Sequence, residues 1–334
     1  MRAVALSRFG GPEVLQVRDL ATPSPGPGEI LVKVAYAGVN PADWKDREGL
    51  TAAFMGATFP YTPGFDAAGT VAAIGSEVTH FEPGDRVFTA SDHGQGKPGS
   101  YAEYVLASDT AVAAVPDALP LDVAACIPVA GLTAWQALFA PDKGALPQDA
   151  AEPPVVFVNG GAGGVGSFAV QFARHAGARV VASCGPDNIA YVQQLGAERV
   201  IDYRQGTAAD ALRQAYPDGV DLLLDAVGAS SLAAPLELVK RGGTLVSVPT
   251  LVDDGDVDAA IAAATAAGKR KVFAFMNDRN VKDELTLIAD LLVTGTIRAP
   301  QIKHFALDEV ARAHRQLQAG HVRGKLVLAI SEDP

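Results

Sequence analysis

Residues 155–166 read Val-Val-Phe-Val-Asn-Gly-Gly-Ala-Gly-Gly-Val-Gly and constrain the fold of this chain more than any other segment. Four apolar residues lead into a G-x-G-x-x-G pattern, and apolar residues then recur at helical spacing as far as Ala176. A buried strand, a tight glycine turn and a helix with free N–H groups at its start bind the pyrophosphate of a dinucleotide. The residues that we expect to lie against that pyrophosphate are Gly161, Gly163, Gly164, Val165 and Gly166.

Five further apolar runs follow this segment at intervals of roughly 20–25 residues, with helical patterns between them. Together with the first run they number six, which is the strand number of a complete dinucleotide-binding fold. The runs are 155–158, 179–182, 199–201, 220–224, 244–248 and 271–275. We therefore expect an α/β domain with a Rossmann-type, doubly wound parallel sheet.

The first third of the chain has a different rhythm, with short β-branched and aromatic runs between Gly and Pro turns. Such a pattern is typical of an antiparallel, barrel-like domain. After the break at Ala299-Pro300, Asp308 can cap a short helix through about Gln318, and a last strand follows at 325–330. These elements are too small for a domain of their own. We expect them to complete the first one. The predicted domains are 1–124 with 299–334, and 125–298.

Charge and cysteine content exclude several classes of protein. Lys and Arg number 27 against 38 Asp and Glu, a net charge of −11, which argues against nucleic-acid or anionic-membrane binding. No apolar stretch reaches the roughly 18 residues that a membrane span needs. The two cysteines, Cys126 and Cys184, exclude an all-cysteine zinc site within one chain. We expect a soluble, cytoplasmic protein.

The end of the second strand indicates which dinucleotide is bound. NAD-binding proteins usually carry an acid there for the ribose 2′-hydroxyl. This chain instead has Ser183-Cys184-Gly185, which leaves room for a 2′-phosphate, so NADP(H) is the predicted cofactor. No Arg or Lys follows closely. The candidates to pair with the phosphate are Tyr203, Arg204, Arg323 and Lys325.

Several segments taken together resemble the medium-chain dehydrogenase/reductase superfamily, in the right order over essentially the whole chain. The greatest similarity is to its zinc-free quinone oxidoreductase branch, which includes zeta-crystallin. The first domain would then be GroES-like. The segments are the glycine loop, 37–43 (Ala-Gly-Val-Asn-Pro-Ala-Asp), 63–69 (Pro-Gly-Phe-Asp-Ala-Ala-Gly), 84–87 (Gly-Asp-Arg-Val), 131–134 (Gly-Leu-Thr-Ala) and Gly324-Lys325.

The resemblance also addresses zinc. Zinc-dependent relatives carry Cys, His and Cys ligands at positions that correspond to Asn40, Phe65 and about Ala130 of this chain. These replacements cannot, or can scarcely, bind zinc. The four-cysteine structural lobe is also missing, since 92–100 is a short Gly-rich loop. Without a Lewis acid, we expect hydride transfer from NADPH to an acceptor that is already electrophilic.

The resemblance implies further site residues, each with a structural alternative. Asn40 would lie beside the nicotinamide with Asp43 near it, although Asn before Pro is also a common helix cap. Lys45, where close relatives carry Tyr, could donate to a carbonyl oxygen, bind phosphate, or simply be solvated. Thr133 would meet the nicotinamide carboxamide. The carboxyl edge of the parallel sheet, where ligands bind in such folds, predicts two further cofactor neighbours: Val227, after the fourth parallel strand, and Phe275, at the end of the last run.

Three functions stay open at this point. The first is an NADPH-dependent reductase of a quinone, without a metal. The second reduces the double bond of an enal or enone, and nothing in the sequence separates it from the first. The third is a cofactor-binding structural protein of crystallin type. The resemblance also implies a homodimer that pairs through the apolar edge at 271–275.

Overall fold

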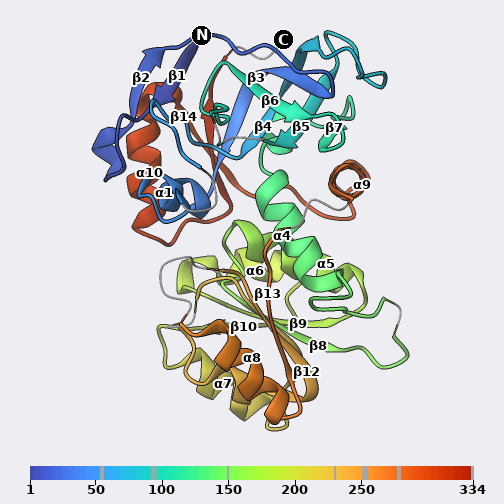
Figure 1. Ribbon diagram of the computed structural model, residues 1–334. Helices are drawn as coiled ribbons and strands as arrows, with labels where there is room; N and C mark the ends of the chain where they lie inside the picture. Colours follow the sequence, from blue (N-terminus) through green and yellow to red (C-terminus); the bar gives the residue numbers. More distant parts are fainter. Residues whose placement is uncertain are drawn as a thin grey trace. The chain divides into compact units, whose positions relative to one another are not determined.

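The computed structural model describes residues 1–52, 56–91, 94, 96–148, 150–228, 231–249, 255–276 and 280–331. The chain forms two compact units (Figure 1). Unit 1 comprises Met1–Leu132, Asn277–Gly295 and Ala299–Pro334, and unit 2 comprises Thr133–Met276 and Thr296–Arg298. The predicted domain boundaries differ from these units mainly at Asn277–Gly295, and they stay a prediction.

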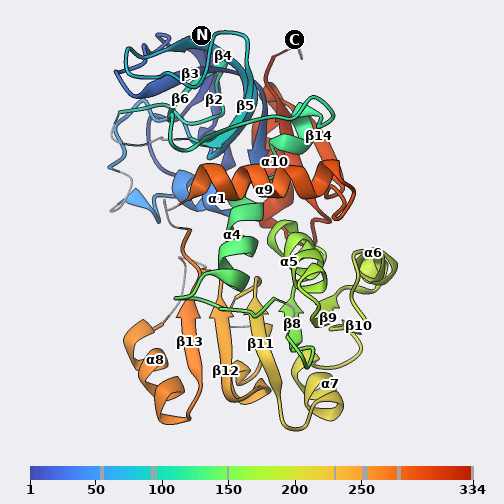
Figure 2. The same cartoon turned by 90° about the vertical axis from the view of Figure 1, so that its right-hand side faces the viewer.

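Unit 2 contains a six-stranded parallel sheet with the strand order β10-β9-β8-β11-β12-β13. Chain order reverses between β8 and β11, so this is the doubly wound Rossmann arrangement that the sequence predicts. Figure 2 shows β13, β12, β11 and β8 side by side with their arrowheads at one edge. The strands are β8 (Val155–Asn159), β9 (Arg179–Cys184), β10 (Arg199–Asp202), β11 (Val220–Asp225), β12 (Val239–Ser247) and β13 (Arg270–Phe273).

Two strands of unit 2 differ from the apolar runs. β12 begins at Val239, five residues before the apolar run. Val239 pairs with Val220, and the polar or glycine residues 240–243 and a register shift separate it from the run, which is why the apolar pattern missed it. β13 ends at Phe273, so Phe275 follows the strand instead of ending it. The helices are α5 (Gly164–His175), α6 (Ile189–Gln194), α7 (Ala208–Ala215) and α8 (Val257–Ala266), with 3-10 turns at Pro186–Asn188 and Pro235–Leu238.

Unit 1 is built around a seven-stranded sheet in which every strand pair but one is antiparallel. The path runs β14-β15-β3-β4-β5-β7, and β6 pairs with β3. The exception is the parallel pair β14 and β15. The strands are β3 (Glu29–Val39), β4 (Asp66–Ile74), β5 (Arg86–Ala90), β6 (Tyr104–Ser108), β7 (Val112–Ala114), β14 (Ile302–Ala306) and β15 (Lys325–Ala329), and a separate hairpin pairs β1 (Arg2–Ala5) with β2 (Gln16–Asp19).

The mostly antiparallel sheet confirms the predicted character of this domain, whereas the pairings among the described residues do not by themselves close a barrel. Residues 326–329 of β15 pair with β3. That this tail completes the first domain stays a prediction. The predicted cap Asp308 instead lies in a 3-10 turn, Leu307–Glu309, before α10. The other helices are α1 (Pro41–Arg47), α3 (Leu121–Ala124), α9 (Val281–Val293), α10 (Val310–Gln318), the 3-10 turn Pro12–Val14 and, across the unit boundary, α4 (Pro128–Phe139).

Each unit has its own apolar core. Val32, Val34 and Leu328 are among the buried side chains of unit 1, and Phe157, Leu223 and Leu245 are among those of unit 2. In the described ranges, no helix is long and apolar enough to cross a membrane.

Candidate functional site

The glycine loop connects β8 to α5, as the sequence predicts. The physical reason for having glycine differs from one position of the loop to another. A Cβ at Gly166 would lie 2.1 Å from the carbonyl oxygen of Gly160, so the protein itself requires glycine there. At Gly163 the nearest atom would be that same oxygen, at 3.7 Å, and the backbone is extended (φ −78°). The chain could accommodate a side chain at Gly163. The open space in front of this backbone is what a phosphate group approaching the start of a helix would need.

The loop is held from both neighbouring strands. The Ser183 hydroxyl, at the end of β9, donates to Asn159 Oδ1 (2.6 Å) and accepts from the backbone N–H of Gly160 (3.1 Å). Asn159 Nδ2 donates to Asp225 Oδ1 (2.9 Å) at the end of β11. The Ser183 hydroxyl is therefore committed inside the protein, and only 1% of the residue is exposed. Its predicted contact with the cofactor stays a prediction, but the hydroxyl already anchors the loop.

Several predicted cofactor neighbours gather at the carboxyl edge of the sheet, where ligands bind in such folds. Val227 is 54% exposed, and its Cγ2 would lie 2.7 Å from a Cβ at Gly160. The backbone N–H groups of Val227 and Gly228 donate to Asp225 Oδ1, which fixes this turn beside the glycine loop. Phe275, after β13, is 58% exposed, and its carbonyl accepts from Lys143 Nζ (2.6 Å).

Tyr203 and Arg204 follow β10 and lie beside the end of β9. The Tyr203 hydroxyl would be 3.4 Å from a Cβ at Gly185, and the Arg204 guanidinium lies 6.0 Å from the Tyr203 ring. Both residues are exposed. The structure thus brings an aromatic ring and a cation to the position where the adenosine ribose usually lies in this fold.

In unit 1 the register of three strands brings Asn40, Asp66 and Lys325 together. Leu326 pairs with Val39, which places Lys325 opposite Asn40, and Tyr36 pairs with Ala68, which brings the start of β4 alongside. Lys325 Nζ donates to Asn40 Oδ1 (2.5 Å) and to Asp66 Oδ2 (2.9 Å). Asn40 Nδ2 donates to Asp66 Oδ2 (2.8 Å).

This arrangement changes two interpretations. Asn40 is the N-cap residue of α1, and its backbone N–H donates to Asp43 Oδ2, but its side chain is hydrogen-bonded to Lys325 and Asp66 and belongs to the Lys325 cluster. Lys325 is 3% exposed and forms a buried ion pair with Asp66, so its ammonium is not the surface partner for a 2′-phosphate that the sequence suggested. Arg323 is half-buried.

Asp43 lies next to this cluster in a chain of buried hydrogen bonds. Its Oδ2 accepts from the backbone N–H of Asn40 (2.5 Å) and from the Tyr101 hydroxyl (2.8 Å). The Tyr101 oxygen lies 3.2 Å from His314 Nε2, and His314 Nδ1 lies 3.1 Å from Arg47 Nη1. A guanidinium only donates, so Nδ1 accepts and the imidazole proton lies on Nε2. Every hydrogen bond in the chain then points toward Asp43.

Burial has the largest effect on the pKa values of Asp43, Tyr101 and His314 in this series of hydrogen bonds. Burial raises the pKa of Asp43 to about 7, against the hydrogen bonds from Asn40 and Tyr101 that favour the carboxylate. Burial and then the nearby Arg47 lower the pKa of His314 to about 3, so its imidazole is neutral. Burial also raises the pKa of Tyr101 well above its usual value, with the Asp43 charge adding to the effect. Tyr101 is therefore a hydrogen-bond donor at neutral pH.

Two predicted residues are buried outside these hydrogen-bonded groups. Lys45, on α1, is 8% exposed, and its Nζ lies 5.6 Å from the centre of the Trp44 ring, so it is not a solvated lysine. Thr133, on α4, is 7% exposed. Their predicted contacts with substrate and cofactor stay predictions.

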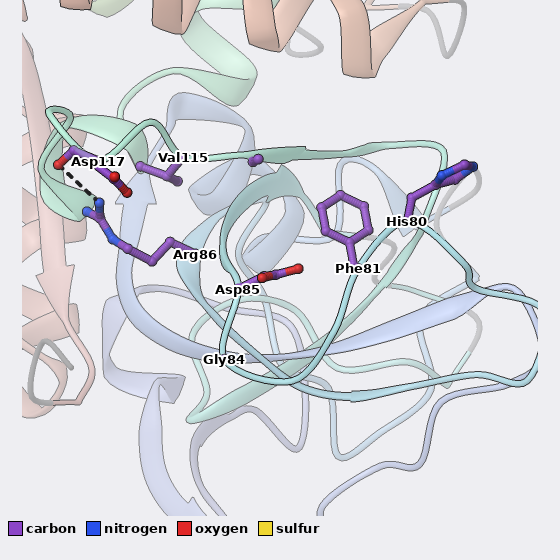
Figure 3. A pocket seen from close by; sticks show the side chains of 8 residues that line it. His80, Phe81, Gly84, Asp85, Arg86, Val115 and Asp117 are labelled. Carbon is purple, nitrogen blue, oxygen red and sulfur yellow. Dashed lines mark hydrogen bonds between the residues drawn. The ribbon is translucent and has the colours of Figure 1, made fainter.

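A surface pocket in unit 1, with a volume of about 430 Å³, is lined by none of the predicted site residues (Figure 3). The Arg86 guanidinium, which helps to line it, is held by the carbonyl groups of Pro116, Asp117 and Leu119. The N–H groups of Arg86 are thus used to stabilise the turn after β7.

Sequence reasoning missed four residues that organise these sites. Asp66 lies inside a segment that carried the family resemblance, and Asp225 ends a predicted strand, so both had a signal. Asn159, the last residue of β8, and Tyr101, just before β6, had none beyond a polar group beside an apolar run. Among the described residues, no three or more His, Cys, Asp or Glu side chains are grouped so that they could hold a metal ion.

Comparison with known proteins agrees with this geometry. Residues 26–117 match the family model of the alcohol dehydrogenase GroES-like domain, and residues 195–328 match that of a zinc-binding dehydrogenase. The quinone oxidoreductase of Lama guanicoe is 32% identical, over 99% of this chain and 98% of the relative. The solved quinone oxidoreductase of Coxiella burnetii is 34% identical, with a TM-score of 0.87 and 99% of each chain covered.

A mycobacterial protein complexed with NADPH is 30% identical, with a TM-score of 0.86, and covers 98% of this chain and 100% of its own. The chain therefore belongs to the medium-chain dehydrogenase/reductase superfamily, in its zinc-free quinone oxidoreductase branch, and is an oxidoreductase. This confirms the family that the sequence motifs indicated.

Proposed function

We propose that the protein reduces a quinone with NADPH and without a metal. The glycine loop is the observation that supports NADPH binding. A side chain at Gly163 would fit against the protein, so packing within the protein does not explain why this residue is glycine, whereas a bound pyrophosphate would. The start of α5 and the backbone of Gly161–Gly166 would hold the pyrophosphate. Tyr203 and Arg204 would hold the 2′-phosphate of NADPH, and Thr133, Val227 and Phe275 would lie along the cofactor.

The bound cofactor supplies a hydride, and the chain's own residues must bind and polarise the acceptor. The metal-free mechanism is supported by residue identity. Asn40 and Phe65 replace ligands of the zinc-dependent relatives, and the ammonium of Lys325 lies beside Asn40 as a built-in positive charge. A quinone is already a strong electrophile, so it can accept a hydride without a metal ion to polarise its carbonyl group. Reduction of an enal or enone would use the same groups and is the second outcome of the test below.

A turnover screen tests the proposal. Purified protein is supplied with NADPH or NADH and with a series of p-quinones, enals, enones and simple aldehydes. We expect the highest kcat/KM with NADPH and a quinone. Faster turnover with NADH contradicts the cofactor assignment, and preferred turnover of enones moves the assignment to the second candidate. NADPH binding without turnover of any acceptor would favour a cofactor-binding structural protein of crystallin type.

We also propose that the protein is a homodimer. β13 lies at the edge of the unit 2 sheet and, among the described strands, pairs only with β12. Its free edge offers backbone groups that a second copy could pair with. Sedimentation velocity should give twice the chain mass of 34.4 kDa, whereas a monomer at micromolar concentration would contradict the dimer. A small-molecule acceptor and a cytoplasmic location, with no nucleic-acid or membrane partner, complete this proposal.

A further inference from the structure

The cluster of Asn40, Asp66 and Lys325 contains more N–H bonds than acceptors. A lysine ammonium carries three N–H bonds and an asparagine carboxamide carries two. Asn40 Oδ1 receives one of these five bonds and Asp66 Oδ2 receives two. Asp66 Oδ1 is already used by the backbone N–H of Val129 (2.8 Å). In the part of the chain that the structure describes, one N–H of Lys325 and one of Asn40 therefore have no acceptor.

These two N–H bonds are shielded from bulk water. Lys325 is 3% exposed, Asn40 is 2% exposed and the Asp66 side chain is fully buried. Folded proteins rarely leave a buried donor without a partner, because its lost hydration is not replaced. An oxygen atom brought by a ligand would accept both bonds. A cation beside a neutral N–H donor favours an oxygen that carries, or gains, negative charge.

We propose that Lys325 Nζ and Asn40 Nδ2 form an oxyanion site for the carbonyl oxygen of the acceptor, and that Asp66 is the positioning residue that orients both donors. This inference rests on the proposed function, because a reduced quinone is the substrate that develops such a charge. When the acceptor gains a hydride, an electron pair moves onto its carbonyl oxygen. The hydride forms a C–H bond at the ring carbon conjugated with this carbonyl, and the C=C electron pair shifts to leave the charge on the oxygen. That oxygen then takes one proton from water, and transfer of a proton from the sp3 ring carbon to the second carbonyl oxygen gives the hydroquinone.

Asp66 suits this positioning role for two reasons. It accepts one N–H from each donor, so neither the ammonium nor the carboxamide can rotate without breaking a buried hydrogen bond. It also offsets the buried charge of Lys325, which would otherwise be costly to hold out of water. Donors that are fixed before the reaction stabilise a developing charge without having to reorient, and this stabilisation is strong where water is excluded.

The first test is Lys325→Met with NADPH and a p-quinone. We expect kcat to fall by about 10²- to 10³-fold, the usual effect of removing one oxyanion donor. KM for NADPH should stay close to that of the wild type, because the glycine loop is untouched. Lys325→Arg keeps the charge and N–H donors and should recover part of kcat. The matched control is Lys303→Met, on the neighbouring strand β14, where Lys303 is exposed and its Nζ donates to Gln316 Oε1 and lies 5.2 Å from the centre of the Phe305 ring.

A second variant covers the case in which Lys325→Met does not fold, since it leaves the buried Asp66 carboxylate without its cation. The double variant Asp66→Asn, Lys325→Met removes both charges, and its thermal unfolding by circular dichroism reports whether it is folded. A folded double variant with wild-type kcat overturns the oxyanion site, whereas a fall in kcat of about 10²- to 10³-fold supports it. If the wild type itself reduces no quinone with NADPH, the proposed function fails instead, and the two failures are thus distinguishable.

Discussion

The glycine loop of unit 2 is formed by backbone atoms, whereas the Lys325 cluster of unit 1 is formed by side chains. The loop is a backbone device, in which an open space at Gly163 and a tight contact at Gly166 lie within twelve consecutive residues. The cluster is a side-chain device, and its members Asn40 and Lys325 are 285 residues apart in the chain. The loop depends on the absence of side chains at its glycines, whereas the cluster depends on the charged and hydrogen-bonding groups of its side chains.

This difference predicts different responses to substitution. A backbone device fails when a side chain is added, either because the fold cannot hold it or because the ligand can no longer approach. A side-chain device fails when a group is removed and its partners are left buried without a hydrogen bond. The following experiments test that distinction, starting with the largest expected effect.

Gly166→Ala should damage the fold itself. The added methyl group would lie 2.1 Å from a backbone oxygen, which cannot move as a flexible side chain could. We expect the free energy of unfolding to fall by about 3 kcal/mol, the upper end for forcing extra atoms into a packed site. Urea unfolding followed by circular dichroism measures this. Stability equal to that of the wild type would contradict the close contact between α5 and the loop.

Gly163→Ala, in contrast, should leave the fold intact and weaken NADPH binding. Its methyl group meets no protein atom closer than 3.7 Å, so thermal unfolding should match that of the wild type. In the holoprotein the same methyl group would occupy space needed by the pyrophosphate, at a cost of roughly 1–3 kcal/mol, or about 5- to 150-fold in Kd. Fluorescence titration with NADPH gives the affinity. Unchanged affinity would contradict the assignment of the pyrophosphate site to this loop.

His314→Gln tests the hydrogen-bond chain of unit 1 through pH. The folded-state pKa of about 3 lies below the usual 6.5, so between these values the unfolded chain binds a proton that the folded chain does not. The stability that His314 contributes is complete above pH 6.5 and is lost as the pH falls. The stability difference between wild type and variant should therefore shrink by about 1.4 kcal/mol per pH unit below pH 6.5.

Urea unfolding at pH 4.5, 5.5 and 6.5 measures this slope. Asp43 acts in the opposite direction, because its pKa is raised from 3.8 to about 7, so the folded chain holds its proton longer and stability falls as the pH rises between these values. The two contributions offset each other in the wild type over the shared range. A pH-independent difference between wild type and variant would show that His314 is protonated equally in both states.

Arg204→Ala should have the smallest effect. The guanidinium is exposed, and an exposed ion pair contributes about 0.2–1 kcal/mol, which corresponds to a change of up to about five-fold in affinity. NADPH should bind more weakly, while NADH, which lacks the 2′-phosphate, should bind as before. Titration of both cofactors against wild type and variant separates the two. An equal loss for both would assign Arg204 a structural role.

The two regions also explain what could be predicted from the sequence. The strand, glycine turn and helix of the loop are contiguous, so their spacing alone predicted the fold of unit 2 and the position of Gly161–Gly166. The position of Asn40 and Lys325 required a family resemblance, and their contact required the register between β3 and β15. Asp66 lies in a segment of the resemblance, but its role was overlooked because a single carboxylate in a β-rich segment has no periodicity that marks it. The 3-10 turn at Leu307–Glu309 shows the same limit for a helix start.

The pairing of β15 with β3 also has a consequence for biosynthesis. β3 leaves the ribosome early, but Lys325 at the start of its neighbour β15 is translated 285 residues after Asn40, so Asn40 can meet Lys325 only after unit 2 has been synthesised. Unit 2 is nearly contiguous, from Thr133 to Met276, and its sheet can assemble while the remaining strands are still being made. During synthesis, the nascent chain would acquire the fold of its nucleotide-binding unit before the Lys325 cluster exists.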